Sequence, residues 1–317
     1  MDRISLVGAA GAIGRSIADA ARRAGRPYRV VGRDEDRLRH CFGSDPLAEI
    51  IAWDPNDAES VRRAMHDVDT VIYLVGVPYN HFELHPVVMR QTLEGACAEN
   101  VERMVLIGTV YPYGAPVTPN VTEEHPRNPH TFKGRMRKQQ EDLLLEADAA
   151  GRIRGTVLRL PDFYGPHVEG SYLHSLFQAA AAGGTANMLG PIDAPHEFLF
   201  VPDAGGVVLA LADKAEAYGS FWNLAGAGVI TQREIIDRVF AMAGRKPKFR
   251  VAGKWTLRVL GLFNPLLREL VEMNYLLTTP VLMDDRALTR LLGDIRKTLY
   301  ETGLKLTLDA YTQRNSA

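Results

Sequence analysis

Short apolar runs alternate with longer helical patterns over about the first 160 residues, and this alternation limits the folds open to the chain. Strands are expected in "RISLVGA", "YRVVGR", "AEIIAWD", "DTVIYLVGV", "ERMVLIGTV" and "GTVLRL". Helices are expected at about 12–24 and in "SVRRAMHDV", "PVVMRQTLEGACAEN" and "TFKGRMRKQQEDLLLEA". Such alternation builds βαβ units, which predicts an α/β protein with a doubly wound parallel sheet.

The pattern changes after about residue 166, where a second lobe is expected to begin. Helices are predicted in "SYLHSLFQAAAAGG" and "DAGGVVLALADKA" with a strand in "HEFLFV" between them, and the last 60 residues or so look mainly helical. We therefore predict a nucleotide-binding domain over 1–165, to which 196–226 return. The remaining segments, 166–195 and 227–317, are predicted to form a smaller, mainly helical substrate lobe.

The segment "LVGAAGAIGRS" places Gly8, Gly11 and Gly14 between the first strand and the first helix. Glycine suits this turn because a Cβ atom would keep a pyrophosphate away from the backbone amides, and the helix N-terminus adds positive potential. A tight strand-to-helix turn without a ligand would also use glycines. The strand before, the helix after and the overall alternation favour dinucleotide binding, with contacts expected from Ala10, Ala12 and Ile13 as well.

The end of the second strand, "VVGRDED", bears on the choice of dinucleotide. An acidic residue about 20 positions after the glycines usually binds the ribose of NAD, whereas an arginine there accommodates the 2′-phosphate of NADP. Arg33 favours NADP, whereas Asp34 would favour NAD. The alternative is that Arg33 is a solvated loop residue that binds no cofactor. Asp54, after the third strand, could accept a hydrogen bond from the adenine amino group or cap the next helix.

Together these features resemble the extended short-chain dehydrogenase/reductases of the NAD-dependent epimerase/dehydratase family. The landmarks are "GAAGAIG", "VIYLVGV", "VLIGTVYPYG", "LRLPDFYGP" and "HEFLFVPDAGGVVLAL". The resemblance implies a Rossmann fold and cofactor contacts from Val75, Gly76 and Pro161. It also implies that Thr109 holds the substrate oxygen, and a homodimer is a family expectation.

The resemblance fails at the family's catalytic element, Tyr-x-x-x-Lys, which belongs on the helix in "TFKGRMRKQQEDLLLEA". One alignment places Lys133 and Arg137 at the two positions, and the other places Thr131 and Arg135 there. Neither supplies a tyrosine.

Several residues near this helix could replace the missing tyrosine. Lys133 is the leading candidate, for acid–base work or for contact with the nicotinamide ribose, although a surface cation is the alternative. Tyr111 could reach the site from the loop after Thr109, and Tyr113 and Tyr164 are candidates that could equally be structural. Of the crowded cations, one or two are expected to pair with Glu141 or Asp142.

Composition excludes several other functions. A net charge of −1 offers no field for nucleic acid, and no apolar run is long enough to span a membrane. Two cysteines, without metal-ligand spacing, fit a reducing cytoplasm and predict no metal site. We predict a cytoplasmic NADP-dependent oxidoreductase, of the carbonyl reductase or alcohol dehydrogenase type, for a small or apolar substrate. The alternatives are a sugar-nucleotide epimerase/dehydratase and a non-catalytic NADP-binding regulator.

Overall fold

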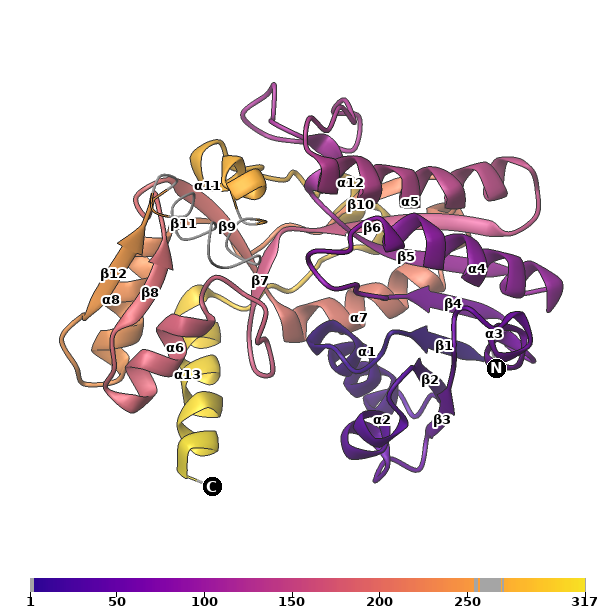
Figure 1. The fold of residues 1–317 in the computed structure, drawn as a ribbon, viewed down its shortest axis with the longest axis horizontal. Helices are drawn as coiled ribbons and strands as arrows, with labels where there is room; N and C mark the ends of the chain where they lie inside the picture. The colour runs from indigo at the N-terminus through magenta and orange to yellow at the C-terminus, as the bar shows by residue number, and fades with distance from the viewer. Residues whose placement is uncertain (1–2, 254–255, 257–268, 270, 317) are drawn as a thin grey trace.

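The structure is a computed structural model that describes residues 3–253, 256, 269 and 271–316. Its largest sheet has seven strands within the described residues, in the order β10-β6-β5-β4-β1-β2-β3, and each neighbouring pair is parallel (Figure 1). The strands are β1 (Ile4–Val7), β2 (Tyr28–Gly32), β3 (Ala48–Ala52), β4 (Thr70–Tyr73), β5 (Arg103–Thr109), β6 (Arg154–Leu160) and β10 (Phe221–Asn223). The order reverses between β1 and β4, which is where such sheets bind ligands. The predicted doubly wound parallel sheet is confirmed.

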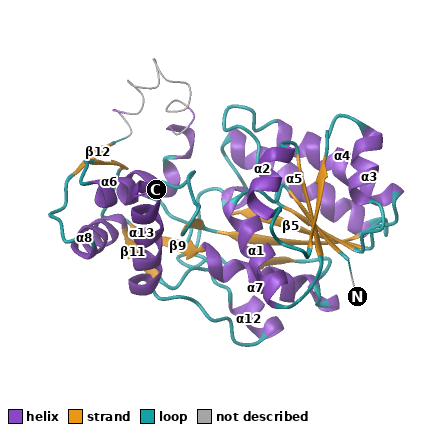
Figure 2. Cartoon of the chain, turned by 90° about the horizontal axis from the view of Figure 1, so that it is seen from below, coloured by secondary structure: helices purple, strands orange, loops and turns teal. Residues whose placement is uncertain are grey.

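Helices cover both faces of this sheet (Figures 1 and 2). One face carries α1 (Ala12–Arg23) and α7 (Val201–Ala212), which pack on each other beside α2 (Glu35–Phe42). The other face carries α3 (Ala58–Met65), α4 (Leu84–Ala98) and α5 (Phe132–Ala149), packed in that order. The sheet strands are buried from both sides, as their continuous apolar runs require.

A second lobe lies beside the strand ends, at the left of Figure 1. It contains α6 (His174–Ala182), α8 (Gln232–Met242) and α13 (Tyr300–Ser316), which pack against one another around a separate apolar core. Two small sheets accompany them. One joins β7 (Asp162–Tyr164), β9 (Pro195–Phe200) and β11 (Val229–Thr231), and the other joins β8 (Ala186–Leu189) and β12 (Phe249–Ala252). The short helices α11 (Tyr275–Thr278) and α12 (Arg286–Leu292) lie between β12 and α13 in the sequence.

Sequence periodicity located the long elements and missed the short ones. The eight-residue helix α2 was not predicted, nor were the strands β7, β8, β10, β11 and β12, which have three or four residues each. Strands of this length carry too few residues for an alternating pattern. Part of the last 60 residues lies outside the described residues, so the expectation of a mainly helical end concerns only α11, α12 and α13. No described helix is long and apolar enough to cross a membrane.

Candidate functional site

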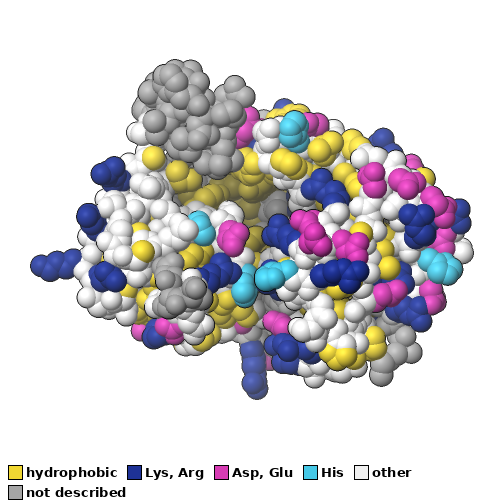
Figure 3. All heavy atoms as spheres, turned by 60° about the horizontal axis from the view of Figure 1, so that its bottom comes forward, with side chains coloured by type: hydrophobic (Ala, Val, Ile, Leu, Met, Phe, Trp, Pro, Cys, Tyr) yellow, Lys and Arg dark blue, Asp and Glu magenta, His cyan; other side chains and the backbone are white. Residues whose placement is uncertain are grey.

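A cavity of about 310 Å³ opens where the carboxyl ends of β1, β4, β5 and β6 meet the start of α1. Its walls are mainly apolar, and Figure 3 shows a hollow lined by hydrophobic side chains between the two lobes. The lining residues are Gly8, Gly11, Ala12, Ile13, Gly14, Leu74, Val75, Gly76, Val77, Tyr79, Phe82, His85, Ile107, Gly108, Thr109, Tyr111, Arg137, Leu160, Pro161 and Phe163. Most of the cofactor contacts expected from the sequence therefore lie at one place.

The glycine loop is shaped to leave one side open. Gly8 has φ +90°, and a Cβ there would lie 2.8 Å from the backbone of Val75. A Cβ at Gly14, the third residue of α1, would lie 2.1 Å from the carbonyl oxygen of Ala9, so only glycine fits at this position. At Gly11 nothing lies within 4 Å of a Cβ, and no side chain of the described residues caps α1 there. The first amides of α1 are thus free to bind an anion, which fits the pyrophosphate of a dinucleotide.

Gly11→Ala should separate cofactor binding from folding. Its methyl group would stand in the open cavity, so we expect NADPH to bind about tenfold more weakly or worse, with an unchanged melting temperature. Gly206→Ala is the matched control, because Gly206 also has open space but lies on α7, away from the cavity. Fluorescence titration with NADPH measures the affinity. Equal binding by both variants would contradict this location for the pyrophosphate.

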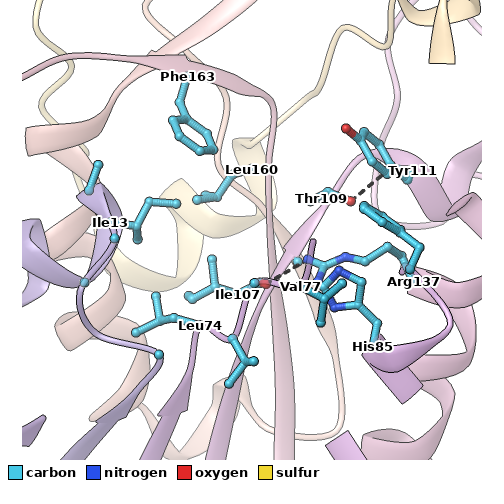
Figure 4. Close-up of a pocket in the computed structure, with 18 of the residues that line it drawn as sticks. Ile13, Leu74, Val77, His85, Ile107, Thr109, Tyr111, Arg137, Leu160 and Phe163 are labelled. Atoms are coloured by element: carbon cyan, nitrogen blue, oxygen red, sulfur yellow. Dashed lines mark hydrogen bonds between the residues drawn. The ribbon is translucent and has the colours of Figure 1, made fainter. Parts of the chain in front are cut away.

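Arg137 brings a guanidinium from α5 into the cavity wall, as Figure 4 shows. The side chain is 7% exposed, and its Nη2 donates to the carbonyl oxygen of Ile107 at 3.1 Å. Its Nη1 donates to Gln140 Oε1 at 2.7 Å and to Nδ1 of His85 at 3.2 Å. Burial, aided by the Arg137 charge, lowers the pKa of His85 to about 2. His85 is therefore uncharged at neutral pH. Arg137 supplies the positive charge at this end of the cavity.

Two residues with hydroxyl groups, Thr109 and Tyr111, line the cavity with Arg137, and the Tyr111 hydroxyl points away from the guanidinium (Figure 4). Thr109 ends β5, and its Oγ1 accepts a hydrogen bond from the backbone N–H of Tyr111 at 3.3 Å. Tyr111 lines the cavity as well. Burial raises the pKa of Tyr111 to about 12, while a hydrogen bond with Tyr79 and the charge of Arg137 act in the opposite direction.

Lys133 lies one turn before Arg137 on α5 but does not line this cavity. The side chain is 1% exposed, and its amine pairs with Glu269 and, at 3.0 Å, with Glu272. Glu272 also accepts hydrogen bonds from the backbone N–H groups of Phe132 and Lys133. The negative charge of Glu272 compensates the positive end of the α5 dipole, which explains why cationic side chains are tolerated at the start of this helix. The predicted surface-cation alternative is wrong, and the amine's partners are carboxylates of the C-terminal lobe.

The other cations of α5 are also accounted for. Lys138 pairs with Asp142 one turn later at 2.7 Å, as predicted. Thr131 caps α5 through its side chain, and Arg135 donates to a backbone carbonyl on the surface. Arg137, which faces the cavity, therefore matches the lysine of the family motif better than Arg135 does. No described residue of α5 supplies a tyrosine.

Two predicted catalytic tyrosines lie away from the cavity lining. Tyr113 is 1% exposed and donates its hydroxyl to Asn223 at 2.8 Å, beneath the loop that follows β5. Tyr164 is also 1% exposed and stacks on Tyr300 with ring centroids 6.0 Å apart. Both side chains are packed as structural residues, which corrects the expectation that they reach the substrate.

The remaining cofactor candidates occupy the rim of the nucleotide-binding domain. Arg33 is exposed at the end of β2 and makes no hydrogen bond or ion pair with any described residue. Asp34 caps α2 by accepting from the backbone N–H of Arg37 at 2.9 Å. Asp54 accepts from Asn56, and Asp57 caps α3, so the capping alternative for Asp54 is wrong.

Ala10 lies in the glycine loop without lining the cavity. Phe82, His85 and Asp162 also lie at or beside this site, and sequence reasoning missed all three. Phe82 precedes α4, His85 lies in its first turn and Asp162 begins β7, and no local sequence pattern marks any of them.

The profile of the NAD dependent epimerase/dehydratase family matches residues 4–225, which is more than half of the chain. The chain belongs to this family. Its membership confirms the resemblance and the expected enzyme class, an NAD(P)-dependent oxidoreductase or epimerase/dehydratase, with NAD(P) as the cofactor. Described residues include no cluster of three or more potential metal ligands.

Similar proteins support the same class. The dTDP-6-deoxy-L-talose 4-dehydrogenase (NAD(P)(+)) of Kitasatospora kifunensis is 26% identical over 261 residues, covering 76% of this chain and 79% of that protein. A UDP-glucose 4-epimerase of Azospirillum brasilense is 28% identical over 170 residues, covering 50% of this chain and 48% of that protein.

The fold is shared with dTDP-glucose 4,6-dehydratase from Bacillus anthracis in complex with NAD. The TM-score is 0.84 at 14% identity, with 100% of this chain and 98% of that chain covered.

Proposed function

We propose that this protein is an NADP-dependent carbonyl reductase in which Tyr111 takes the place of the missing helix tyrosine. The observation that carries the proposal is the meeting of Thr109, Tyr111 and Arg137 on one wall of the cavity that begins at the glycine loop. Apolar side chains make up most of the remaining wall, which suits a small or apolar substrate.

Reduction of a carbonyl group requires a hydride and a proton. The bound nicotinamide would supply the hydride. Thr109 would hold the substrate oxygen by a hydrogen bond, and the Tyr111 hydroxyl would donate its proton to that oxygen. The tyrosinate left behind would be stabilised by the Arg137 charge and by the hydrogen bond with Tyr79, and would then regain a proton from solvent.

The protonation state of Tyr111 suits the role of proton donor. Burial raises its pKa to about 12, so the hydroxyl is protonated at neutral pH and ready to donate to a carbonyl oxygen. In the reverse reaction, oxidation of an alcohol, the tyrosinate form would act as the base.

The pH profile of reduction should be flat from about pH 6 to about pH 9. Tyr111 would lose its proton only near pH 12, and His85 would gain one only near pH 2, so neither changes charge in this range. The measurement is kcat/KM for an aldehyde at saturating NADPH. A fall in rate with a midpoint near pH 7 would show that another group supplies the proton.

Arg33→Ala should reduce the preference for NADPH over NADH by about 10- to 100-fold, because a charged hydrogen bond to phosphate is lost. The unpartnered, exposed Arg33 at the end of β2 supports NADP over NAD. Arg63→Ala, which removes another exposed arginine on α3, is the control. The two dissociation constants are compared for each variant. If the ratio of the NADPH and NADH dissociation constants is unchanged in Arg33→Ala, Arg33 does not select NADP.

A sugar-nucleotide epimerase or dehydratase is the second candidate, favoured by the activities named for the similar proteins. A panel of aldehydes and ketones with NADPH, run beside dTDP- and UDP-sugars, tests both functions. Oxidation of NADPH by a simple carbonyl supports the reductase. Turnover of the sugar nucleotides alone supports the second candidate. Tight NADPH binding without turnover of any of them supports a non-catalytic regulator.

A further inference from the structure

Four tyrosines lie close to one another beside the cavity, and we call them the tyrosine cluster: Tyr79 and Tyr111, which line the cavity, and Tyr172 and Tyr275, which lie next to them. They come from four separate segments, and each is half-buried rather than packed away. Phe82 joins two of them, with ring centroids 5.2 Å from Tyr79 and 6.3 Å from Tyr111. Tyr79, Phe82 and Tyr111 line the cavity together, and an aromatic wall of this kind is typical of a ligand site.

Asp162, at the start of β7, places a carboxylate among these rings. Burial raises the pKa of each hydroxyl in the tyrosine cluster, and the Asp162 charge raises all four further. Its Oδ2 lies 2.8 Å from Nε2 of His196, whose ring centroid is 6.4 Å from that of Tyr172. The carboxylate is about a quarter exposed, so it remains open to a ligand.

An ammonium group already rests against this wall. The Lys133 amine lies 4.9 Å from the ring centroid of Tyr79 and 5.6 Å from that of Phe82. Glu269 and Glu272 pair with the same amine, and with Asp162 these three carboxylates outnumber the two nearby cations, Lys133 and Arg137, by one. The other nearby cation, Arg137, donates its hydrogen bonds at the inner end of the cavity. Aromatic faces with excess negative charge attract cations and repel phosphates.

We propose that the tyrosine cluster and Asp162 form a specificity site for an organic ammonium group carried by the substrate. The proposal deepens the proposed function and rests on it for the reacting carbonyl. The carbonyl would meet Thr109 and Tyr111 at the inner end, while the cationic end would lie among the outer rings. A nucleoside diphosphate would bring two negative charges to the same place and be disfavoured.

The test is calorimetric titration of the full-length, NADPH-loaded protein with choline and with 3,3-dimethylbutan-1-ol, its uncharged isostere. Choline is expected to bind at least about tenfold more tightly, because the two probes differ only in charge. Asp162→Asn, which keeps a polar partner for His196, should remove most of that difference. Asp309→Asn, at an exposed carboxylate on α13, should leave it unchanged.

Variants of Tyr275 separate the aromatic face from the fold. Tyr275→Phe keeps the ring and should retain choline binding, whereas Tyr275→Leu should weaken it by about fivefold or more. Equal affinity for the two probes, or tighter binding of UDP-glucose than of choline, would overturn the proposal. The binding measurement does not require turnover. A preference for choline in a protein that reduces no carbonyl would therefore contradict the reductase function and still support the ammonium site.

Discussion

Tyr111→Phe should lower kcat for carbonyl reduction by about 100- to 10,000-fold, the range that a general acid contributes. Phenylalanine keeps the ring that contacts Phe82 and loses only the hydroxyl, which forms a hydrogen bond with Tyr79. NADPH affinity should change little, because the hydroxyl is assigned to the substrate oxygen. Stopped-flow measurement of NADPH absorbance in a single turnover separates the chemical step from release of product.

Tyr113→Phe is the matched control for this prediction. It removes a hydroxyl from the same short turn, but that hydroxyl bonds Asn223 away from the cavity. The expected loss is about 1–3 kcal/mol of stability, since the buried Asn223 oxygen loses its donor, with kcat nearly unchanged. A full rate in Tyr111→Phe, or an equal loss in both variants, would contradict the role given to Tyr111.

Lys133→Met should destabilise the protein by about 3 kcal/mol, near the lower limit for breaking a buried ion pair. The amine is 1% exposed, and its loss leaves Glu269 and Glu272 without their shared cation. We expect the substrate KM to rise, because the segment that carries Tyr275 loses its ion pairs to α5 and keeps only the backbone hydrogen bonds to Glu272, while kcat stays within about threefold. Chemical denaturation and steady-state kinetics measure the two effects.

Lys305→Met provides the comparison for Lys133→Met. Lys305 pairs with Asp309 one turn later, and both side chains are about half exposed, so the cost should be under about 1 kcal/mol. The double variant Lys133→Met/Glu272→Gln should recover part of the stability lost by the first change. A fall in kcat as large as that expected for Tyr111→Phe would instead return the acid–base role to Lys133.

The sequence was sufficient for features whose causes are local. The glycine loop is recognisable because Gly8 and Gly14 are required by backbone contacts within one strand-to-helix turn and its neighbouring strand. Thr109 was assigned through the family resemblance, at the end of a strand that the sequence pattern already predicted. The parallel sheet was also predictable, because a chain in which strands and helices alternate forms βαβ units.

Side-chain orientation was not predictable, because distant partners decide it. Lys133 and Arg137 lie one turn apart on α5, yet one is held by Glu272, 139 residues later in the chain, and the other by Ile107 on β5. Tyr164 is removed from the cavity region by Tyr300 of α13. None of these contacts leaves a periodic mark in the sequence.

The most direct test is an experimental structure of the protein with NADPH and a slow carbonyl substrate or its alcohol product bound. We predict that the ligand oxygen beside the nicotinamide ring lies within about 3.2 Å of both the Tyr111 and the Thr109 hydroxyl oxygens. Arg137 should lie behind Tyr111, with Lys133 still paired to Glu272. A ligand oxygen bonded to the Lys133 amine, with Tyr111 turned away, would contradict the relocation of the proton donor.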